Sequence, residues 1–598
     1  MVSPHGLSKC RVDCMIARTD PEFLRVARGE APGDLVIVNG EIVDVFTRQI
    51  RPASVLIFGG RIAAVLPSRV DVAARERVDA SGRVILPGLI DAHVHIESMM
   101  LPPSGCAELV VPHGTTGLVA DPHEIANVCG IPGIRWMMAD AANAPMRVWF
   151  TASSCVPASS METANATLER EDLAPLFDDP RVIGLAEMMN FPGTIAGDAA
   201  LLAKIALGLD RRGRVDGHAP GLRGRSLQAY VASGPSSDHE CFTAEEAMEK
   251  ISSGQRVFIR EGSAARNLAA LLPAVTQANA HRFCLCTDDV HACEVVDDGH
   301  LDRVIRRAAA MGFDGPTAVA MASLHVAEHF GLHEYGAIAA GMAADLSIAT
   351  IKSGKWSDLK IDATFVGGRL ISESGRCVQS IATIDIPSFL RKTVRLPSGF
   401  SEKSFALAAQ KDVPARVVGI IPGQIMTDSK REIPRVIDGV LHADVTRDLL
   451  ILASIERHGR GGKIGIGLVQ GFGLHSGAIA STIGHDAHNL SIAGVDPRDM
   501  VVAAQRLAEI GGGQCIAQGG KILAELPLAI AGLLSDQTPD SVARSQHAMQ
   551  KAYELLGGKL SDPFMQLAFL PLSVIPHLKV SDCGIIDVDV FRIVSLQD

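Results

Sequence analysis

The sequence has few aromatic residues and no run of cationic ones. Phe, Tyr and Trp make up 4% of the 598 residues, whereas hydrophobic residues reach 47% and charged residues 21%. This composition is typical of a globular protein and excludes a disordered chain. Because the net charge is -11 and no basic run occurs, we expect neither nucleic acid nor an anionic membrane surface as the main partner.

Long apolar runs and paired cysteines are also missing. No stretch of about 18 uncharged apolar residues occurs, which predicts that no helix crosses a membrane. The opening segment, MVSPHGLSKCRVDCMIARTDPEF, lacks the apolar core of a signal peptide. The twelve cysteines include no C-x-x-C pair, and Cys10 and Cys14 fall in an expected tail. We therefore expect free thiols and a cytoplasmic protein.

Two segments rich in β-branched residues flank the middle of the chain. Residues 34–66 and 343–371 both break short apolar runs with Asn-Gly or Gly-Gly pairs, which are hairpin signals. They predict one small β-domain built from both flanks, with residues 34–82 as its first part and 336–395 as its second. Residues 1–33 are expected to be an N-terminal extension.

Between the flanks, short apolar runs alternate with helix-like stretches, which predicts an α/β fold with a (β/α)8 barrel over residues 83–335. The sixth run is the weakest, because its apolar content is poor. From residue 396 to 598, hairpin-like and helical segments predict a separate C-terminal α+β domain. The eight runs are residues 84–96, 114–123, 147–157, 182–188, 215–220, 236–240, 256–263 and 283–289.

Polar residues gather where these runs end. His93 and His95 are two positions apart, so both point to one face if the first run is a strand. Carboxyl ends of strands form the face on which barrel enzymes place their chemistry. The other residues at or just beyond a strand end are Asp121, Glu187, His218, His239, Glu261 and Asp288.

This set contains the ligands of a metal centre. Nitrogen and carboxylate donors suit Mn(II), Fe(II) or Zn(II), and no thiolate is needed. Glu187, at the end of the fourth run, is placed to bridge two metals. We expect two divalent ions per chain, Mn(2+) first, with Fe(2+) and Zn(2+) as alternatives. The expected ligands are His93, His95, Glu187, His218, His239 and Asp288.

The ordered set resembles the metal-dependent amidohydrolases, many of which bridge two metals with a carboxylated lysine where this chain has Glu187. The segments DPHEIANVCG, SSCVPA, GLAEMMNFPG, IREGSAARNL, CTDD and GFGLHSGAIASTIGHDAHN are similar to bacterial adenine deaminases of that type, from about residue 34 to near the C-terminus. The resemblance implies that a metal-activated hydroxide attacks C6 of adenine, giving hypoxanthine and ammonia in purine salvage. It also implies a homodimer or higher homo-oligomer.

This mechanism suggests roles for single residues. Asp288, as a metal ligand next to the nucleophile, is expected to accept the proton of the attacking water, while Glu124, Asp121, Glu240 or Glu261 carries a proton to N1 or the leaving nitrogen. The resemblance implies that Asp289 hydrogen-bonds the purine ring; its alternative is a helix N-cap. Glu261, Ser263 and Arg260 are further candidate contacts to the base, although Ser263 and Arg260 would serve equally to brace Glu261.

Several alternatives stay open. His123 fits a proton shuttle, a substrate contact or an extra metal ligand, and GHDAHN, residues 484–489, fits a second metal site, a lid or a buried hydrogen-bond network. His113, His291 and His300 are expected to be surface or loop histidines. Rival functions are an amidohydrolase acting on a cyclic amide or another aminated heterocycle, and an inactive scaffold. Cytidine deaminases combine H-x-E with P-C-x-x-C, and this pair of motifs is absent because the sequence has no P-C-x-x-C. The cytidine-deaminase type of zinc site is therefore excluded.

Overall fold

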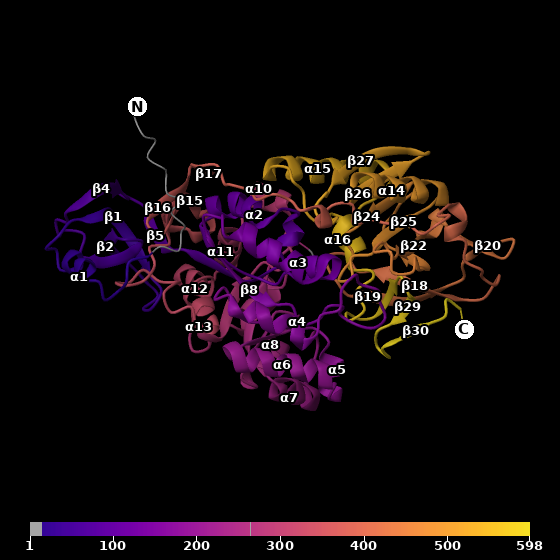
Figure 1. Ribbon diagram of the computed structural model, residues 1–598, viewed down its shortest axis with the longest axis horizontal. Helices are drawn as coiled ribbons and strands as arrows, with labels where there is room; N and C mark the ends of the chain where they lie inside the picture. Colours follow the sequence, from indigo (N-terminus) through magenta and orange to yellow (C-terminus); the bar gives the residue numbers. More distant parts are fainter. Residues whose placement is uncertain (1–14, 264, 598) are drawn as a thin grey trace.

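A computed structural model describes residues 15–263 and 265–597. Figure 1 shows a small sheet at one end, a barrel in the middle and a second large sheet at the other end. Cys10 and Cys14 lie outside the described residues, so the expected tail is not tested. Within those residues, no helix is both long and apolar enough to span a membrane.

The first sheet joins both flanks of the chain, as predicted. Its order is β17-β16-β15-β14-β5-β1-β2-β3, with β4 also paired to β1. The short helix α1 (Pro21–Ala27) buries Phe23 and Val26 against this sheet. The strands are β1 (Gly33–Asp44), β2 (Gln49–Phe58), β3 (Arg61–Leu66), β4 (Ala74–Asp79), β5 (Val84–Pro87), β14 (Leu346–Thr350), β15 (Lys360–Val366), β16 (Arg369–Glu373) and β17 (Arg376–Cys377).

The first predicted run, 84–96, is two strands rather than one. β5 belongs to the flanking sheet, whereas β6 (Leu89–Val94) belongs to the barrel. The break falls at Gly88, where an added Cβ would lie only 2.0 Å from Oγ1 of Thr116. A side chain at residue 88 therefore has no space. The domain boundaries proposed from the sequence stay predictions.

The middle of the chain has a TIM-barrel-like fold of parallel strands. One sheet has the order β10-β9-β8-β7-β6 and the other β11-β12-β13. The backbone N–H of Ser236 donates to the carbonyl of Val215 at 2.8 Å, which links the two sheets on one side. The remaining strands are β7 (Thr115–Ala120), β8 (Arg147–Ala152), β9 (Val182–Met188), β10 (Val215–Gly217), β11 (Ser237–Asp238), β12 (Arg256–Arg260) and β13 (Phe283–Cys286).

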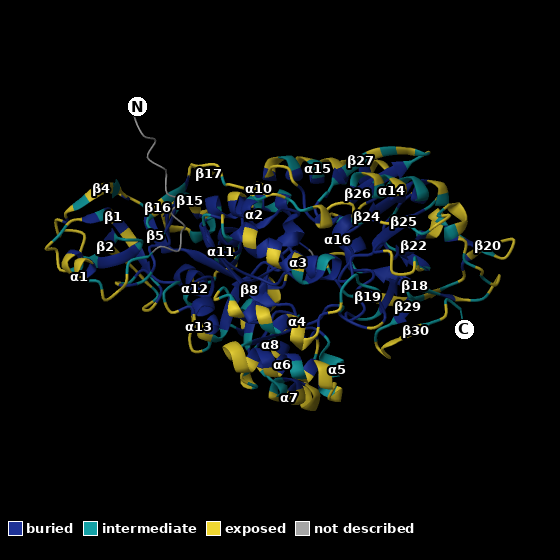
Figure 2. Cartoon of the chain, in the orientation of Figure 1, coloured by how far each residue is buried: buried dark blue, intermediate teal, exposed yellow. Residues whose placement is uncertain are grey.

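Buried side chains from these strands form the middle of the barrel. One apolar cluster combines Ile90, Val119, Trp149, Phe258 and other strand residues, and Figure 2 shows the strands buried beneath partly exposed helices. The helices around the strands include α2 (Pro103–Val110), α3 (His123–Ala141), α6 (Ala199–Arg212), α7 (Gly224–Ser233), α8 (Ala244–Ser252), α11 (Leu301–Ala310), α12 (Gly315–Met321) and α13 (Leu324–Phe330).

The C-terminal sheet covers the carboxyl ends of the barrel strands. Its order is β19-β18-β23-β22-β25-β24-β26-β27, and α14 (Pro497–Ile510) packs on one face. Core residues of the sheet share a second cluster with residues of the barrel. The strands are β18 (Ala415–Ile420), β19 (Thr427–Glu432), β22 (Leu449–Ile455), β23 (Ile464–Gln470), β24 (Ala478–Ser481), β25 (Leu490–Gly494), β26 (Gly513–Gln518) and β27 (Lys521–Pro527).

Hydrogen bonds fix this cover to the loop after β8. Ser573 shares a hydrogen bond of 2.7 Å with Ser159 and donates to Glu162 at 3.0 Å. Ser581 donates to the carbonyl of Met161 at 2.5 Å. Since all these side chains are buried, the C-terminal region is packed onto the barrel as part of one structure.

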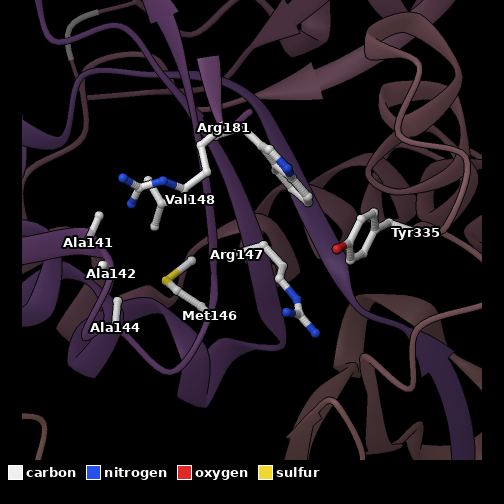
Figure 3. A pocket seen from close by; sticks show the side chains of 9 residues that line it. Ala141, Ala142, Ala144, Met146, Arg147, Val148, Arg181 and Tyr335 are labelled. Atoms are coloured by element: carbon white, nitrogen blue, oxygen red, sulfur yellow. The ribbon is translucent and has the colours of Figure 1, made fainter. Parts of the chain in front are cut away.

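At the opposite end of the barrel, an ion pair ties β8 to the flanking sheet. Arg147, the first residue of β8, donates to Asp345 through Nε at 3.0 Å and Nη2 at 3.3 Å. Figure 3 shows Arg147 and Tyr335 among the residues that line a pocket there. The guanidinium carbon of Arg147 is 5.4 Å from the centroid of the Tyr335 ring. Polar contacts at this end serve stability rather than chemistry.

The short sixth strand depends on a buried lysine. Nζ of Lys250 lies 3.0 Å from Asp238 in β11 and donates to Glu246 at 2.8 Å and to the carbonyl of Ala219 at 2.7 Å. The Asp238 carboxylate accepts the backbone N–H groups of Ala219 and Glu240. This ionic contact compensates for the low apolar content that made the sixth run the weakest sequence signal.

Lys250→Met is expected to lower the free energy of unfolding by about 3–5 kcal/mol, because it leaves Asp238 and Glu246 buried without their cation. Urea unfolding followed by circular dichroism measures the change. Lys352→Met, on an exposed position, is the matched control and should change it by less than about 0.5 kcal/mol. A Lys250→Met protein as stable as the control would show that the contact does not hold β11.

Candidate metal centre

The six predicted ligands converge at the carboxyl ends of the barrel strands. His93 lies within β6 and His95 follows it, Glu187 lies near the end of β9, and the others follow β10, β11 and β13. Nε2 of His95 is 3.2 Å from Nε2 of His93 and 3.2 Å from Oδ1 of Asp288. All six side chains are buried. The convergence inferred from strand ends is present.

Glu187 stands between two pairs of histidines. Its Oε1 is 3.8 Å from Nε2 of His93 and 3.3 Å from Nε2 of His95. Its Oε2 is 2.5 Å from Nδ1 of His218 and 3.2 Å from Nε2 of His239. One carboxylate oxygen therefore faces each pair, which is the arrangement that a bridging ligand requires.

The protonation states of the two carboxylates suit metal ligation. Burial raises the pKa of the Glu187 carboxyl, but His218 and His239 outweigh it and hold the pKa well below its usual range. Burial and Arg260 act in the same opposing way on the pKa of Asp288, which is also held well below its usual range. Burial, with His239, lowers the pKa of His93. For the other three histidines, burial lowers the pKa, but the neighbouring carboxylates outweigh burial and raise the pKa of His95, His218 and His239. Ionised carboxylates and neutral histidines bind metals, so these three histidines would release a proton when an ion binds.

Backbone contacts fix two of the ligands. The phenol of Tyr230 donates to the carbonyl of Met188 at 2.8 Å and accepts the N–H of His218 at 3.0 Å, which ties Glu187's strand to the loop of His218. Asp288 has φ of 56°, and its N–H donates to the carbonyl of His93 at 3.0 Å. A left-handed residue that is not glycine is uncommon and often marks a functional position.

The donor set fits divalent metals. It offers imidazole nitrogens and carboxylate oxygens without thiolate, the chemistry that suits first-row divalent ions. Nε2 of His218 is buried and has no hydrogen-bond partner among the described residues. Groups of these ligands have donor atoms within 4.8 Å of one another, including His93 with His95 and Asp288, and His93 with Glu187 and His239. The nitrogen of His218 that faces the other donors is Nδ1, 2.5 Å from Oε2 of Glu187, so the clustered imidazole and carboxylate atoms fit a metal site.

Arg260 contacts the predicted ligand Asp288 and does not brace Glu261. Its Nη1 donates to Oδ2 of Asp288 at 2.6 Å and to Glu240, and its Nη2 donates to Glu240 at 2.9 Å. Both Arg260 and Glu240 line the cavity beside the ligands. The carboxylate of Glu240 is also 3.6 Å from Nε2 of His239.

Glu261 and Ser263 are not brought to this cavity. Glu261 accepts from Arg307 at 2.9 Å and from the N–H of Leu268 at 3.2 Å. Ser263 accepts from the N–H of His291 and lines a different pocket with Asp562. Neither is among the residues that line the metal-centre cavity. The sequence placed both near a strand end, but their side chains leave the barrel mouth.

Asp289 and Glu124 meet through a serine that the sequence analysis did not single out. Ser98 is 2.5 Å from Oδ1 of Asp289 and 3.4 Å from Oε1 of Glu124 through its hydroxyl. Asp289 lines the cavity and is not a helix cap, because α10 (Ala292–Asp298) has His291 at its N-cap position. Ser98 follows His95 by three residues in the segment HIESMM. This spacing does not indicate that the side chain of Ser98 turns toward Asp289.

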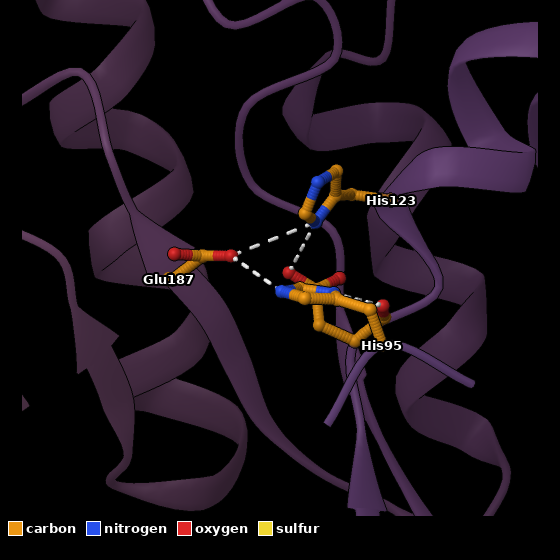
Figure 4. Close-up of side chains that lie close together, drawn as sticks. His95, His123 and Glu187 are labelled. Carbon is orange, nitrogen blue, oxygen red and sulfur yellow. Dashed lines mark hydrogen bonds and ion pairs between the residues drawn. The ribbon is translucent and has the colours of Figure 1, made fainter. Parts of the chain in front are cut away.

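Asp121 and His123 lie beside the predicted ligands His95 and Glu187. Nδ1 of His123 is 3.0 Å from Oδ2 of Asp121 and 3.6 Å from Oε1 of Glu187. Figure 4 shows His95, His123 and Glu187 turned toward one another. The donor atoms of these three residues and of Asp121 lie within 4.8 Å of one another. Each of the roles considered for His123 is compatible with this position.

The GHDAHN loop reaches the barrel site, which the sequence analysis did not connect. Oδ1 of Asp486 is 3.4 Å from Nε2 of His123, and Nδ1 of His485 is 3.6 Å from Oε1 of Glu124. The cavity is lined on this side by Ile425, His485, Asp486, Phe569 and Leu572. No periodicity pairs a loop in the C-terminal region with strands that precede it by hundreds of residues.

Two histidines expected at the surface are buried. His291 is 3.0 Å from Asp562, and burial is outweighed by that carboxylate, which raises the pKa of His291 to about 9. His300 is fully buried, within 2.9 Å of the Thr115 hydroxyl and 3.4 Å of Asp91. His113 is partly exposed and lies 3.5 Å from Asp302. The polar loops that contain His291 and His300 are covered by neighbouring elements, which the local sequence does not reveal.

Comparison with known proteins agrees with these features. Residues 84–371 match the model of the amidohydrolase family, and residues 424–592 match that of the adenine deaminase C-terminal domain. Adenine deaminase of Desulfatibacillum aliphaticivorans is 44% identical over 96% of this chain and 99% of its own length. That of Cereibacter sphaeroides strain ATCC 17025 is also 44% identical over the same shares.

Solved structures are more distant. The crystal structure of an adenine deaminase covers 57% of this chain at 18% identity with a TM-score of 0.45, so the assignment rests on the sequence relatives. These match the chain at more than 40% identity and almost in full. The chain therefore belongs to the adenine deaminases of the amidohydrolase family.

Proposed function

We propose that this protein catalyses the hydrolytic deamination of adenine to hypoxanthine and ammonia. The observation that carries the proposal is Glu187, which presents one carboxylate oxygen to each of two histidine pairs. The nearly full-length similarity to adenine deaminases supports the choice of substrate. A homo-oligomer and a cytoplasmic location stay predictions.

Two divalent ions are proposed, Mn(2+) first and Fe(2+) or Zn(2+) as alternatives. His93, His95 and Asp288 would hold one side of the centre, His218 and His239 the other, and Glu187 both. When bound, such ions act as Lewis acids and lower the pKa of water from 15.7 to about 7. The enclosing side chains are nearly all buried, so little bulk water competes with the substrate.

Asp288 is proposed to accept the proton of the attacking water. Its Oδ2 is engaged by Arg260 at 2.6 Å, whereas its Oδ1 faces His93 and His95. Arg260 thus orients the carboxylate and keeps it ionised until it takes a proton. Glu240 accepts hydrogen bonds from the same guanidinium. It is therefore placed to stabilise the positive charge of Arg260 when Asp288 takes up a proton.

Glu124 lies behind the cavity-lining residues Asp289 and His485 and is the first choice for the proton that reaches N1 or the leaving nitrogen. Burial raises the pKa of its carboxyl despite the neighbouring His485 and His95. Ser98 connects it to Asp289, the proposed hydrogen-bond partner of the purine. Asp121, which His123 engages, is the alternative donor.

Substrate identity is tested by ammonia release from the Mn(II)-loaded enzyme. Adenine should be turned over, with adenosine, guanine, cytosine and hydantoin at least about 100-fold slower in kcat/KM, since a misplaced reacting centre loses that much. Hydantoin gives N-carbamoylglycine and no ammonia when its ring opens, so its turnover is followed by chromatography. Ammonia from cytosine or ring opening of hydantoin, without turnover of adenine, would instead assign a different amidohydrolase substrate.

Glu187→Gln is expected to lose one of two bound metals per chain and to reduce kcat by at least about 100-fold, because the neutral amide no longer bridges two cations. Inductively coupled plasma mass spectrometry counts the metal. Glu108→Gln, at an exposed position, is the control and should keep both ions. Two ions and full activity in Glu187→Gln would remove this residue from the centre.

Asp288→Asn is expected to keep at least one metal yet to lose turnover by about 100- to 10,000-fold, the range found when a general base is removed. Metal analysis and steady-state kinetics on one preparation separate the two effects. Asp297→Asn, also exposed, should behave as the unchanged protein. Wild-type kcat in Asp288→Asn would contradict its proposed role as proton acceptor.

A further inference from the structure

One wall of the cavity comes from the C-terminal region. Five lining residues belong to it, and they face the metal ligands that end the barrel strands: Ile425, His485, Asp486, Phe569 and Leu572. Three of the five are apolar and one is an imidazole. A planar, mostly apolar ligand with a few ring nitrogens matches a wall of this kind.

Two residues in this wall have an unused polar atom, His485 at a ring nitrogen and Asp486 at the acceptor Oδ2. The His485 ring stacks on Phe569 with centroids 4.4 Å apart and planes 10° apart. Nδ1 is 3.6 Å from carboxylate oxygens of both Glu124 and Asp486. Nε2 is buried and has no hydrogen-bond partner among the described residues. Buried polar atoms are nearly always paired, so this nitrogen is available to bind a ligand.

The loop that carries His485 is held in place. The His485 N–H donates to the carbonyl of Ala568 at 2.8 Å. Buried Arg457 donates to the carbonyl of His488, and Nε2 of His458 is 2.8 Å from the carbonyl of Ala487. The amide of Asn489 donates to the carbonyl of Thr163 at 3.0 Å, across to the barrel side. The imidazole is therefore preorganised rather than free to turn away.

The charges around His485 make Nε2 a hydrogen-bond donor. Burial lowers the pKa of its imidazole, but Glu124 and Asp486 outweigh burial and raise the pKa to about 9. An imidazolium carries a proton on both ring nitrogens. One proton faces the carboxylates at Nδ1, and the other is available at Nε2.

We propose that His485 is a substrate-contacting residue whose Nε2–H donates a hydrogen bond to a ring nitrogen of the purine, N3 or N7, while the Phe569 wall packs against the base. The proposal rests on the proposed function, because adenine supplies these acceptors. N1 is not the partner, since it lies beside C6 at the reacting edge and must face the metal ligands. The C-terminal region would thus complete the substrate site.

Kinetics of His485→Ala test the contact. KM for adenine should rise about 10- to 100-fold, the loss of a hydrogen bond to a charged group, while kcat changes less than about threefold and both metals stay bound. His475→Ala, on an exposed position of the same region, should leave KM unchanged. Unchanged KM in His485→Ala, in a preparation whose wild type deaminates adenine, would overturn the proposal. A joint fall of kcat, metal content and melting temperature would also overturn it, because that pattern indicates a structural role.

Binding of deaza analogues identifies the acceptor. Calorimetric titration of 3-deazaadenine and 7-deazaadenine into both proteins should show one analogue that loses affinity for the wild type and binds His485→Ala equally well. Equal losses on mutation for both analogues would contradict the contact. If the wild type binds adenine in this way but releases no ammonia, the contact stands and the proposed function fails.

Discussion

The structure of the site depends on one backbone contact between the first and last strands of the barrel. The N–H of Asp288 donates to the carbonyl of His93, and the N–H of His95 donates back to the carbonyl of Asp288. This pair brings the last ligand next to the first two. The left-handed backbone at Asp288 turns its side chain between the two histidines and Arg260. Three separated parts of the sequence thereby share one charge cluster.

That cluster places several ionised groups out of contact with water, and its stability rests on how they are combined. Isolated buried carboxylates are costly, but Glu187 is surrounded by five histidines and Asp288 by Arg260 and two of the same histidines. The opposite charges of these side chains stabilise one another. Removing any one of them would leave its neighbours buried without a partner, so the arrangement requires all of them together. The same stabilisation keeps the carboxylates ionised and able to bind cations.

The strand-end rule accounts for the predicted residues that the structure brings together. His93, His95, Glu187, His218, His239 and Asp288 are found by counting runs, because parallel strands in a barrel present their carboxyl ends on one face. Glu261 and Ser263 satisfy the same rule but turn outward, since a loop residue's direction depends on its packing. The first run is also two strands, a break that the sequence analysis did not predict. Local patterns give positions along the chain, not orientations.

Long-range contacts are the part that the sequence does not provide. His485 and Asp486 come near Glu124 and His123 through the packing of one region on another. Their spacing in GHDAHN resembles a self-contained metal motif, so local reasoning considered them separately. His291 and His300 show the same limit, because polar residues in loops are buried when another element covers them. Burial is a property of the whole fold.

The sheet built from both flanks has a consequence for biosynthesis. β5 bonds on one side to β1 and on the other to β14, which follows it by more than 250 residues. During translation the amino-terminal strands emerge long before their partners, and the open edge of β5 offers unpaired backbone groups throughout that interval. Such an edge is prone to pair with other chains, and sequence-distant pairings form slowly. The order in which this sheet receives its strands therefore leaves one edge of β5 open until β14 has been made.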